Sequence, residues 1–492
     1  ALIFLIVLSV IGLGLSSQYR TPLQSAAWPD KPVIEVMPFG SLVDDQTHLA
    51  FAQGFTSEVL HKISHLDGFY VIKPEIRGAS GFDRSAIDVD QELQTDYVLS
   101  GNVQIHGTEI RIAVELKNAQ SGHIEPLNFK RHFDLQTYFD LQAEVALAIA
   151  ETLKFETGPE VVERVVARPT DQLDAHRHYL LAKDAWMDRT HDSLQSAIQH
   201  LRTALQLEPQ SARYNGFLGI VYTTLAENEL TDDVSSCFRA ALDHAEIALA
   251  SDPNNCEALI VLADYSERSR DFVQAEAYLL AAAHISNGDE TVHQSLAELY
   301  IKTGNIAKGL EHIQVARILN PFNPAVRWLE NKFLLAFGKI EESKKSNETL
   351  IKGWPEYPNV QNYLWEYHLV RGEYAQALDA IPDAPGSSRH TIMASLVLID
   401  QQDWQALEAL HGDREMSTSL KLLAATQRND AELACRLLRN ALANDEFWWT
   451  SYLQVAPFAA FEKLKSQPCT EDILKQYGIG IHHVPRSEIY EI

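Results

Sequence analysis

The chain has 492 residues, with 41 Lys and Arg against 67 Asp and Glu, which gives a formal net charge of −26 at pH 7. A chain of this length is sufficient for about two to four domains, each with its own core. A surface this acidic repels phosphate backbones, so the composition argues against nucleic-acid binding by this portion of the protein.

The chain begins with an apolar run that indicates a membrane. No residue between Leu2 and Leu15 is charged. A helix over Ala1–Ser16 would be roughly 24 Å long, shorter than the roughly 30 Å hydrocarbon core of a bilayer. We therefore expect residues 1–17 to be a transmembrane helix truncated at its start, with a linker at 18–30. The alternative is the apolar part of a secretion signal, cleaved near Ser25–Ala27.

Residues 31–157 are expected to form a small α/β sandwich with one sheet. Segments rich in β-branched residues mark strands, and apolar residues recurring every three or four positions mark helices. The segment 109–116 alternates apolar and polar residues, as a half-exposed strand does. The expected strands are 33–39, 69–72, 97–105, 109–116 and 123–133, and the expected helices are 48–66, 89–93 and 138–155.

This segment resembles the TolB amino-terminal-like domain, which bacterial signalling proteins carry outside the membrane. The resemblance rests on KPVIEVMPFGSL at 31–42, FAQGFTSEVL at 51–60, DYVLSGNV at 96–103 and AQSG at 119–122. These residues are mostly turn glycines and a buried Pro-Phe pair. The resemblance therefore implies a fold and a setting rather than a ligand.

Residues 171–465 repeat at about 34 residues, which indicates an α-solenoid of helix pairs. Prolines end successive units, and small residues lie where two helices must approach closely. The units resemble tetratricopeptide repeats, most closely the one with Leu296, Ala297, Tyr300, Gly309, Ile313, Ala316 and Pro321. Later units are looser: a second helix after Gly372 is cut short at Ile381-Pro382, and degenerate pairs follow near 403–407 and 431–435. Residues 466–492 are taken as a C-terminal tail, so the fold class is α+β, mostly α.

A stack of such pairs curls into a superhelix, and the first helix of each pair lines its concave groove. The resemblance implies a protein or peptide partner in this groove, with a small-molecule signal as the other class of ligand. Ordinary solvated helix positions are the alternative for each residue. The implied groove positions include residues of both charges, with acidic residues in excess: Arg213, Glu257, Asp264, Gln294, Glu298, Lys302, Asn362 and Glu366.

The four cysteines are too few and too widely spaced for a disulfide scaffold or a CxxC metal site. Cys237 and Cys256 are nearest in sequence. Near the starts of two antiparallel helices they would lie roughly 20 Å apart, whereas a disulfide needs Cα atoms within about 7 Å. We expect this pair to stay unbridged, and all four cysteines, Cys435 and Cys469 included, to be small buried apolar side chains.

No motif for catalysis or cofactor binding is found. The chain has no P-loop, no dinucleotide-binding GxGxxG before a helix and no GxSxG elbow. His61 and His65 lie four apart on one helix face, but zinc takes a third protein ligand and none is visible. We expect no enzyme activity, cofactor or metal within these residues. On so acidic a surface, neighbouring carboxylates should also raise the pKa values of the histidines.

A membrane span, a TolB-like domain and helical repeats in this order resemble the outer portion of ToxR/CadC-type transcription activators. Relatives of class III adenylate cyclases carry the same outer part. The resemblance implies a single inner-membrane span, a periplasmic location after about residue 18, and an output domain upstream of Ala1. We expect a non-catalytic sensor that signals across the membrane, with homodimer formation as the way it passes its state. The alternative is a membrane-tethered repeat scaffold that assembles envelope proteins or a large membrane complex.

Overall fold

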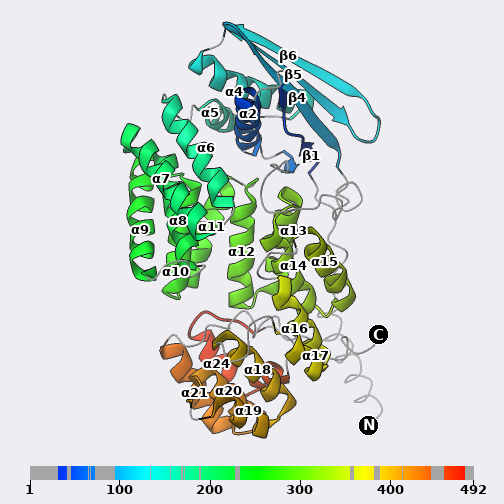
Figure 1. Cartoon of the computed structure of the whole chain (residues 1–492), viewed down its shortest axis with the longest axis vertical. Coiled ribbons are helices and arrows are strands. Elements are labelled where there is room, and N and C mark those ends of the chain that lie inside the picture. The colour runs from blue at the N-terminus through cyan, green and yellow to red at the C-terminus, as the bar shows by residue number, and fades with distance from the viewer. Residues whose placement is uncertain are drawn as a thin grey trace, which may run out of the picture.

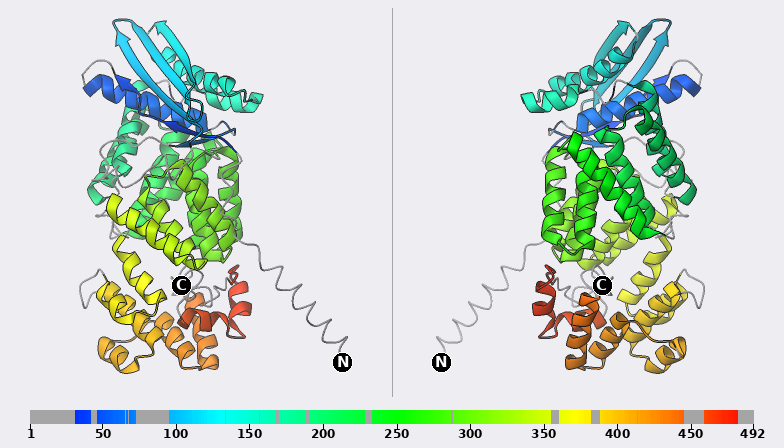
Figure 2. Two further views of the ribbon diagram at one scale, coloured as in Figure 1. Left: turned by 90° about the vertical axis from the view of Figure 1, so that its right-hand side faces the viewer. Right: turned by 90° about the vertical axis from the view of Figure 1, so that its left-hand side faces the viewer.

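The computed structural model describes residues 31–41, 46–64, 66, 68–72, 95–132, 134–155, 157–167, 170, 172–187, 190–227, 233–286, 288–354, 360–381, 388–412, 414–444 and 459–481. The α/β domain lies at one end, helical pairs form the middle, and the last helices lie at the other end (Figure 1, Figure 2). Within the described ranges, no helix is both long and apolar enough to cross a membrane. The expected span and linker, residues 1–30, fall outside these ranges.

The amino-terminal domain is built on one mixed sheet, as expected. Its elements are β1 (Val33–Val36), β2 (Gly40–Ser41), α2 (Gln46–Ser64), β3 (Tyr70–Ile72), β4 (Tyr97–His106), β5 (Glu109–Asn118), β6 (Ile124–His132), α4 (Leu135–Thr152) and α5 (Pro159–Val166). The strand order is β3-β1-β4-β5-β6, with β2 also paired to β4. β1 is parallel to β3 and β4, whereas β4, β5 and β6 are antiparallel. The helical turns expected at 89–93 lie outside the described residues.

The helices α2 and α4 share one core with the sheet, and β5 shows how the sequence selects the covered face. Ile110, Ile112 and Val114 are at most 1% exposed and join Phe55 of α2 and Phe139 of α4 in that core. The residues between them along β5 are exposed. Because successive side chains of a strand point to opposite faces, the polar face of the sheet remains open to solvent.

Helical pairs follow, and their tetratricopeptide-like organisation is confirmed. They are α6 (Leu173–Met187) with α7 (His191–Leu207), α8 (Ala212–Glu227) with α9 (Val234–Ser251), α10 (Cys256–Arg268) with α11 (Phe272–Ile285), α12 (Glu290–Thr303) with α13 (Ile306–Leu319), α14 (Pro324–Ala336) with α15 (Ile340–Gly353), α16 (Val360–Val370) with α17 (Tyr374–Asp379), α18 (Ser388–Gln401) with α19 (Trp404–His411), and α20 (Thr418–Gln427) with α21 (Ala431–Ala443). Two short helices end the described chain, α23 (Ala459–Lys465) and α24 (Thr470–Lys475).

The 34-residue period is visible in the turns inside the pairs. Arg270, Gly304, Gly338 and Gly372 each have a positive φ, between 59° and 78°, and follow one another at intervals of 34 residues. A left-handed residue lets the chain leave one helix and enter the next tightly, and glycine adopts this conformation without steric cost. The repeat is therefore a repeat of backbone geometry as well as of apolar spacing.

The sheet edge rests on the middle of the solenoid. Val33 of β1 and Ile72 of β3 share a small apolar core with Ile318 of α13, Leu350 of α15 and Trp354. All five side chains are at most 6% exposed. Burial of such side chains stabilises a contact by roughly 1.5–3 kcal/mol each. The α/β domain is thus packed on the repeats.

A disulfide corrects the expectation for the cysteines. Cys435 of α21 is bonded to Cys469, the residue before α24, with Cα atoms 6.0 Å apart. The two cysteines are 34 residues apart, in a part of the chain where the helix pairs are degenerate. Their spacing in the sequence therefore did not predict the bond. Cys237 and Cys256 form no disulfide, as expected, and both side chains are partly buried.

The described part of the expected C-terminal tail is packed on the repeats. Ile473, Leu474 and Ile479 are at most 3% exposed and belong to the core of the last helices. The backbone N–H of Gly480 donates to the carbonyl of Thr303 at the end of α12, at 2.8 Å. These apolar side chains explain why the segment up to residue 481 does not extend freely from the solenoid.

Candidate functional site

The groove positions expected from the sequence lie on the first helix of successive pairs. In the middle of the solenoid, α10 packs beside α8 and α12. This packing brings together Asp264 of α10 with Glu298 and Lys302 of α12. Two carboxylates that the sequence reasoning missed, Glu227 of α8 and Glu267 of α10, belong to the same set. We call these five residues the groove cluster.

Direct contacts hold two parts of the groove cluster. The ammonium of Lys302 donates to the Glu267 carboxylate, and Gln294 Nε2 donates to Glu298 Oε1 at 2.9 Å. The side chain of Glu267 is 9% exposed and that of Lys302 is 40% exposed. The cluster is therefore partly enclosed but open to a partner on the Lys302 side.

The surroundings of the groove cluster favour protonated carboxyls. Enclosure by the protein, with the charges of Glu227 and Glu267, raises the pKa of Asp264 well above its ordinary 3.8. Enclosure and the charge of Glu298 raise the pKa of Glu227 to about 7. Enclosure alone would lower the pKa of Lys302, but Glu267 and Glu298 raise it above 10.5. The cluster thus has one firmly held cation, Lys302, and two carboxyls, Asp264 and Glu227, that would release their protons to solvent when a second cation approaches.

At one end of the groove, Arg213 pairs with the α/β domain. Its Nη2 donates to the two carboxylate oxygens of Glu58 in α2, at 3.2 and 3.3 Å. The guanidinium also lies over the Tyr179 ring, 4.8 Å from its centroid. Burial opposes ionisation of Glu58, but Arg213 and His176 outweigh it and hold the pKa of this carboxyl below 4.5. The structure therefore places Arg213 in a contact between domains.

Lys62 and His176 lie beside the Glu58–Arg213 pair. We call these four residues the Glu58 cluster. Lys62 Nζ donates to the carbonyls of Val165 and Ala167, at 2.6 and 2.9 Å. Burial lowers the pKa of Lys62 to about 8, although Glu58 opposes the shift. His176 Nε2 lies 3.7 Å from Glu58 Oε1, and burial lowers its pKa to about 4. At neutral pH, His176 is therefore neutral and Lys62 is charged.

The remaining groove positions divide into three cases. Glu366 of α16 accepts from Lys332 of α14 at 2.6 and 2.8 Å, and both side chains are less than 10% exposed. This pair is a contact between repeats. Enclosure and the carboxylate of Asp289 raise the pKa of Glu257 in α10. Asn362 belongs to α16, but its side chain lies outside the described residues.

Some of the missed residues could have been predicted from the sequence, and others could not. Glu267 lies three residues after Asp264 on α10, so helical spacing alone predicts that the two share a face. Glu58 and Lys62 are four apart on α2 in the same way. Nothing in the sequence pairs Glu58 with Arg213, because the two are 155 residues apart. Helical spacing could therefore have added Glu267 to the groove cluster, whereas it gives no signal for Glu227 or for the Glu58–Arg213 pair.

The histidines behave differently from the sequence expectation. Burial lowers, rather than raises, the pKa values of His200, His244, His312 and His411, so that expectation is wrong for these four. His61 is exposed on α2, while His65 lies outside the described residues. Across the described ranges, no group of three or more His, Cys, Asp or Glu side chains is arranged to hold a metal ion.

Comparisons with known proteins give a limited picture. No family model matches the chain. It is 26% identical over 237 residues to putative adenylate cyclase 3 of Rhizobium meliloti (strain 1021), covering 48% of this chain and 40% of that relative. The chain therefore spans less than half the length of this relative.

Two solved structures are similar to the chain at low identity. PilF of Pseudomonas aeruginosa has 18% identity and a TM-score of 0.34, covering 47% of this chain and 97% of that one. The human IFIT1 dimer with m7Gppp-AAAA has 14% identity and a TM-score of 0.37, covering 70% of this chain and 76% of that one. At these scores the likenesses carry no argument about function.

Proposed function

We propose that the chain is the non-catalytic sensor or interaction region of a membrane-anchored bacterial signalling protein, of the ToxR/CadC or adenylate-cyclase-associated type. In this proposal an inner-membrane span precedes the TolB-like domain, and the residues after about 18 lie in the periplasm. The groove binds a partner, and the bound state passes to an output domain outside this chain.

The Glu58 cluster is the observation that carries the proposal. Arg213 is paired with Glu58 of α2 and also interacts electrostatically with Glu257 of the groove. A cationic partner that engages the groove carboxylates changes the electrostatic field at Arg213, and with it the pairing to α2. Binding in the repeats is thereby coupled to the domain nearest the expected membrane span.

The groove cluster favours a partner with basic residues. It holds four carboxyl side chains against one ammonium, and the raised pKa values of Glu227 and Asp264 mean that uncompensated anions at these two positions are costly. A Lys or Arg side chain brought into the groove relieves this cost by pairing with them. We therefore infer that the partner is a protein or peptide segment with several basic side chains.

Two further observations support the setting. Disulfides persist in oxidising compartments, and the Cys435–Cys469 bond suits the periplasm. The similarity to a protein named putative adenylate cyclase 3 supports a signalling role, in which any catalytic output would lie outside this chain.

Binding of fluorescently labelled octalysine to the full chain tests the groove. We expect the double variant Asp264→Asn with Glu298→Gln to weaken binding about tenfold, a loss of about 1.4 kcal/mol. The matched control is Glu408→Gln with Glu432→Gln, which removes the same charge from exposed positions on other helices. Equal weakening by both pairs would mean that only the net charge attracts the peptide.

The gene sequence upstream of Ala1 separates the sensor from its rival. A winged helix or a nucleotide cyclase encoded there supports the sensor. A start codon followed by a few basic residues supports the membrane-tethered scaffold instead.

A further inference from the structure

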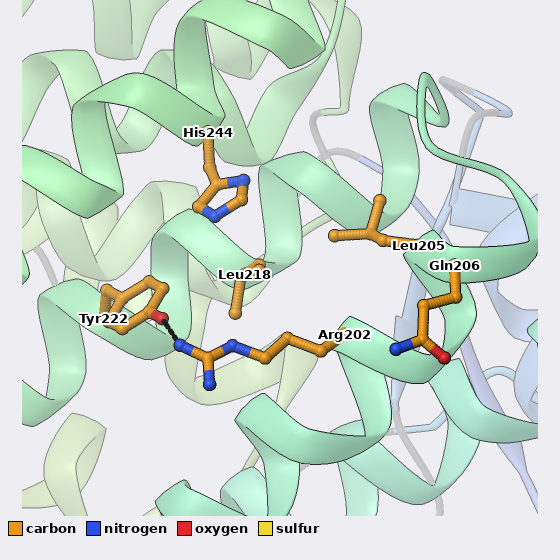
Figure 3. A pocket seen from close by; sticks show the side chains of 6 residues that line it. All are labelled: Arg202, Leu205, Gln206, Leu218, Tyr222 and His244. Atoms are coloured by element: carbon orange, nitrogen blue, oxygen red, sulfur yellow. Dashed lines mark hydrogen bonds between the residues drawn. The ribbon is translucent and has the colours of Figure 1, made fainter.

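A pocket outside the groove lies where α7, α8 and α9 meet. It has a volume of about 390 Å³ and is lined by Arg202, Leu205, Gln206, Leu218, Tyr222 and His244. In Figure 3 the Arg202 side chain runs across the pocket to Tyr222, with Leu218 and the His244 ring above it. The pocket is a shallow depression that is largely open to solvent.

A buried hydrogen-bond chain fixes one wall of this pocket. Asn215 is 1% exposed, and its Nδ2 donates to the carbonyls of Pro209 and Ser211 at 3.1 and 2.9 Å. Its Oδ1 is therefore the atom that accepts from His244 Nδ1, at 2.8 Å. With the hydrogen on Nδ1, the other ring nitrogen of neutral His244 is an acceptor. The ring stacks on Tyr222, with centroids 6.0 Å apart and 9° between the planes.

Arg202 supplies a cation without a balancing anion. Its Nη2 donates to the Tyr222 hydroxyl at 2.9 Å, which leaves further N–H donors of the guanidinium for another acceptor. Among the described residues, no carboxylate lies within ion-pair distance of Arg202. Arg202 is exposed, so on a chain of net charge −26 its guanidinium, oriented by a tyrosine, is accessible to an anionic ligand.

The fourth repeat unit contains a similar Tyr-His stack, but there the nearby cation is paired with a carboxylate. Tyr300 is the eleventh residue of α12, as Tyr222 is of α8. It stacks on His312 with centroids 5.6 Å apart. Its hydroxyl donates to Glu276 at 2.7 Å, and Lys308 lies 3.5 Å from that carboxylate. The comparison isolates Arg202 as the feature that makes the pocket on α8 different.

We propose that this pocket binds a small organic carboxylate with an apolar body. The carboxylate accepts from the Arg202 guanidinium, and the hydrocarbon part lies on Leu205 and Leu218. The Tyr222 and His244 rings form the side wall. This pocket is separate from the groove cluster. If hexanoate does not bind, the proposal that octalysine binds at the groove cluster therefore still stands.

Saturation-transfer difference NMR on the full chain tests the proposal with hexanoate as the probe. We expect hexanoate to receive saturation, and Arg202→Gln to weaken its binding about tenfold or more, since a charge-assisted hydrogen bond is lost. The matched control is Lys308→Gln, which removes a cation from the equivalent stack and should change binding by less than about twofold. Tyr222→Phe should weaken binding severalfold, because the guanidinium loses the group that orients it.

Four results would overturn the proposal. Absence of saturation transfer to hexanoate, or equal transfer in the Arg202→Gln variant, would remove the role of the guanidinium. Equally tight binding of 1-hexanol would mean that the pocket takes any apolar chain. Displacement of hexanoate by an equal concentration of inorganic phosphate would mean that it is a simple anion site.

Discussion

Substitution of Glu58 by Gln removes the anion on which the Glu58 cluster depends, with little change of shape. The carboxylate is 3% exposed and lies 3.2 Å from Arg213 Nη2. At an effective dielectric constant of about 20, two charges at this distance interact by about 5 kcal/mol. Breaking one partner of a buried ion pair typically costs about 3–5 kcal/mol, because the other charge stays buried and uncompensated. We expect Glu58→Gln to lower the free energy of unfolding by that amount.

Urea unfolding followed by circular dichroism measures this loss. The control is Glu144→Gln, which breaks the Arg131–Glu144 pair at 2.9 Å, where the side chains are 49% and 40% exposed. Exposed pairs contribute about 0–1 kcal/mol, so the control should change stability little.

The pH dependence of the Glu58→Gln effect has a defined sign. Because the folded-state pKa of Glu58 is below its ordinary 4.5, the stability it contributes is fully present above about pH 4.5. That stability is lost as the pH falls through the folded value. A loss no larger than that of Glu144→Gln, or one that is the same at pH 7 and under acid conditions, would refute the ion-pair reasoning.

Three other substitutions probe separate parts of the fold. Cys435→Ser should destabilise the last helices by about 3–4 kcal/mol, the value for a cross-link across 34 residues, and reductant should reproduce the loss in urea unfolding of the parent chain. Because burial lowers the pKa of His312 from 6.5 to about 4, stability should fall as the pH drops through that interval, by about 2 kcal/mol at pH 5. Thermal melts of His312→Asn should show a smaller drop. Lys332→Met alone should cost about 3–5 kcal/mol, while Lys332→Met with Glu366→Leu should restore most of that stability in the same assay.

The local elements of this fold could be predicted because their causes are local. Alternation along 109–116 predicted a strand with one covered face, and β5 has it. The glycines at 304, 338 and 372 have the left-handed backbone that a tight turn between paired helices requires. Ile381-Pro382 predicted that the helix after Gly372 would be short, as α17 is.

The contacts that join distant elements could not be predicted in this way. Arg213 was expected to face the groove, but nothing on α8 indicates that a carboxylate 155 residues earlier would reach it. The Cys435–Cys469 bond likewise depends on how the looser pairs stack, which spacing does not encode. Groove residues near one another on α10 and α12 were foreseen because the repeat itself aligns them.

Hydrogen–deuterium exchange of α2 tests the central claim that the groove and the α/β domain are coupled. Exchange of the amides in Gln46–Ser64 is measured on the full chain with and without saturating octalysine. We predict that the peptide changes exchange in α2 as well as in α10 and α12, and that Arg213→Gln removes the effect on α2 alone. Peptide binding that alters α10 and α12 but leaves α2 unchanged in the parent chain would contradict the account.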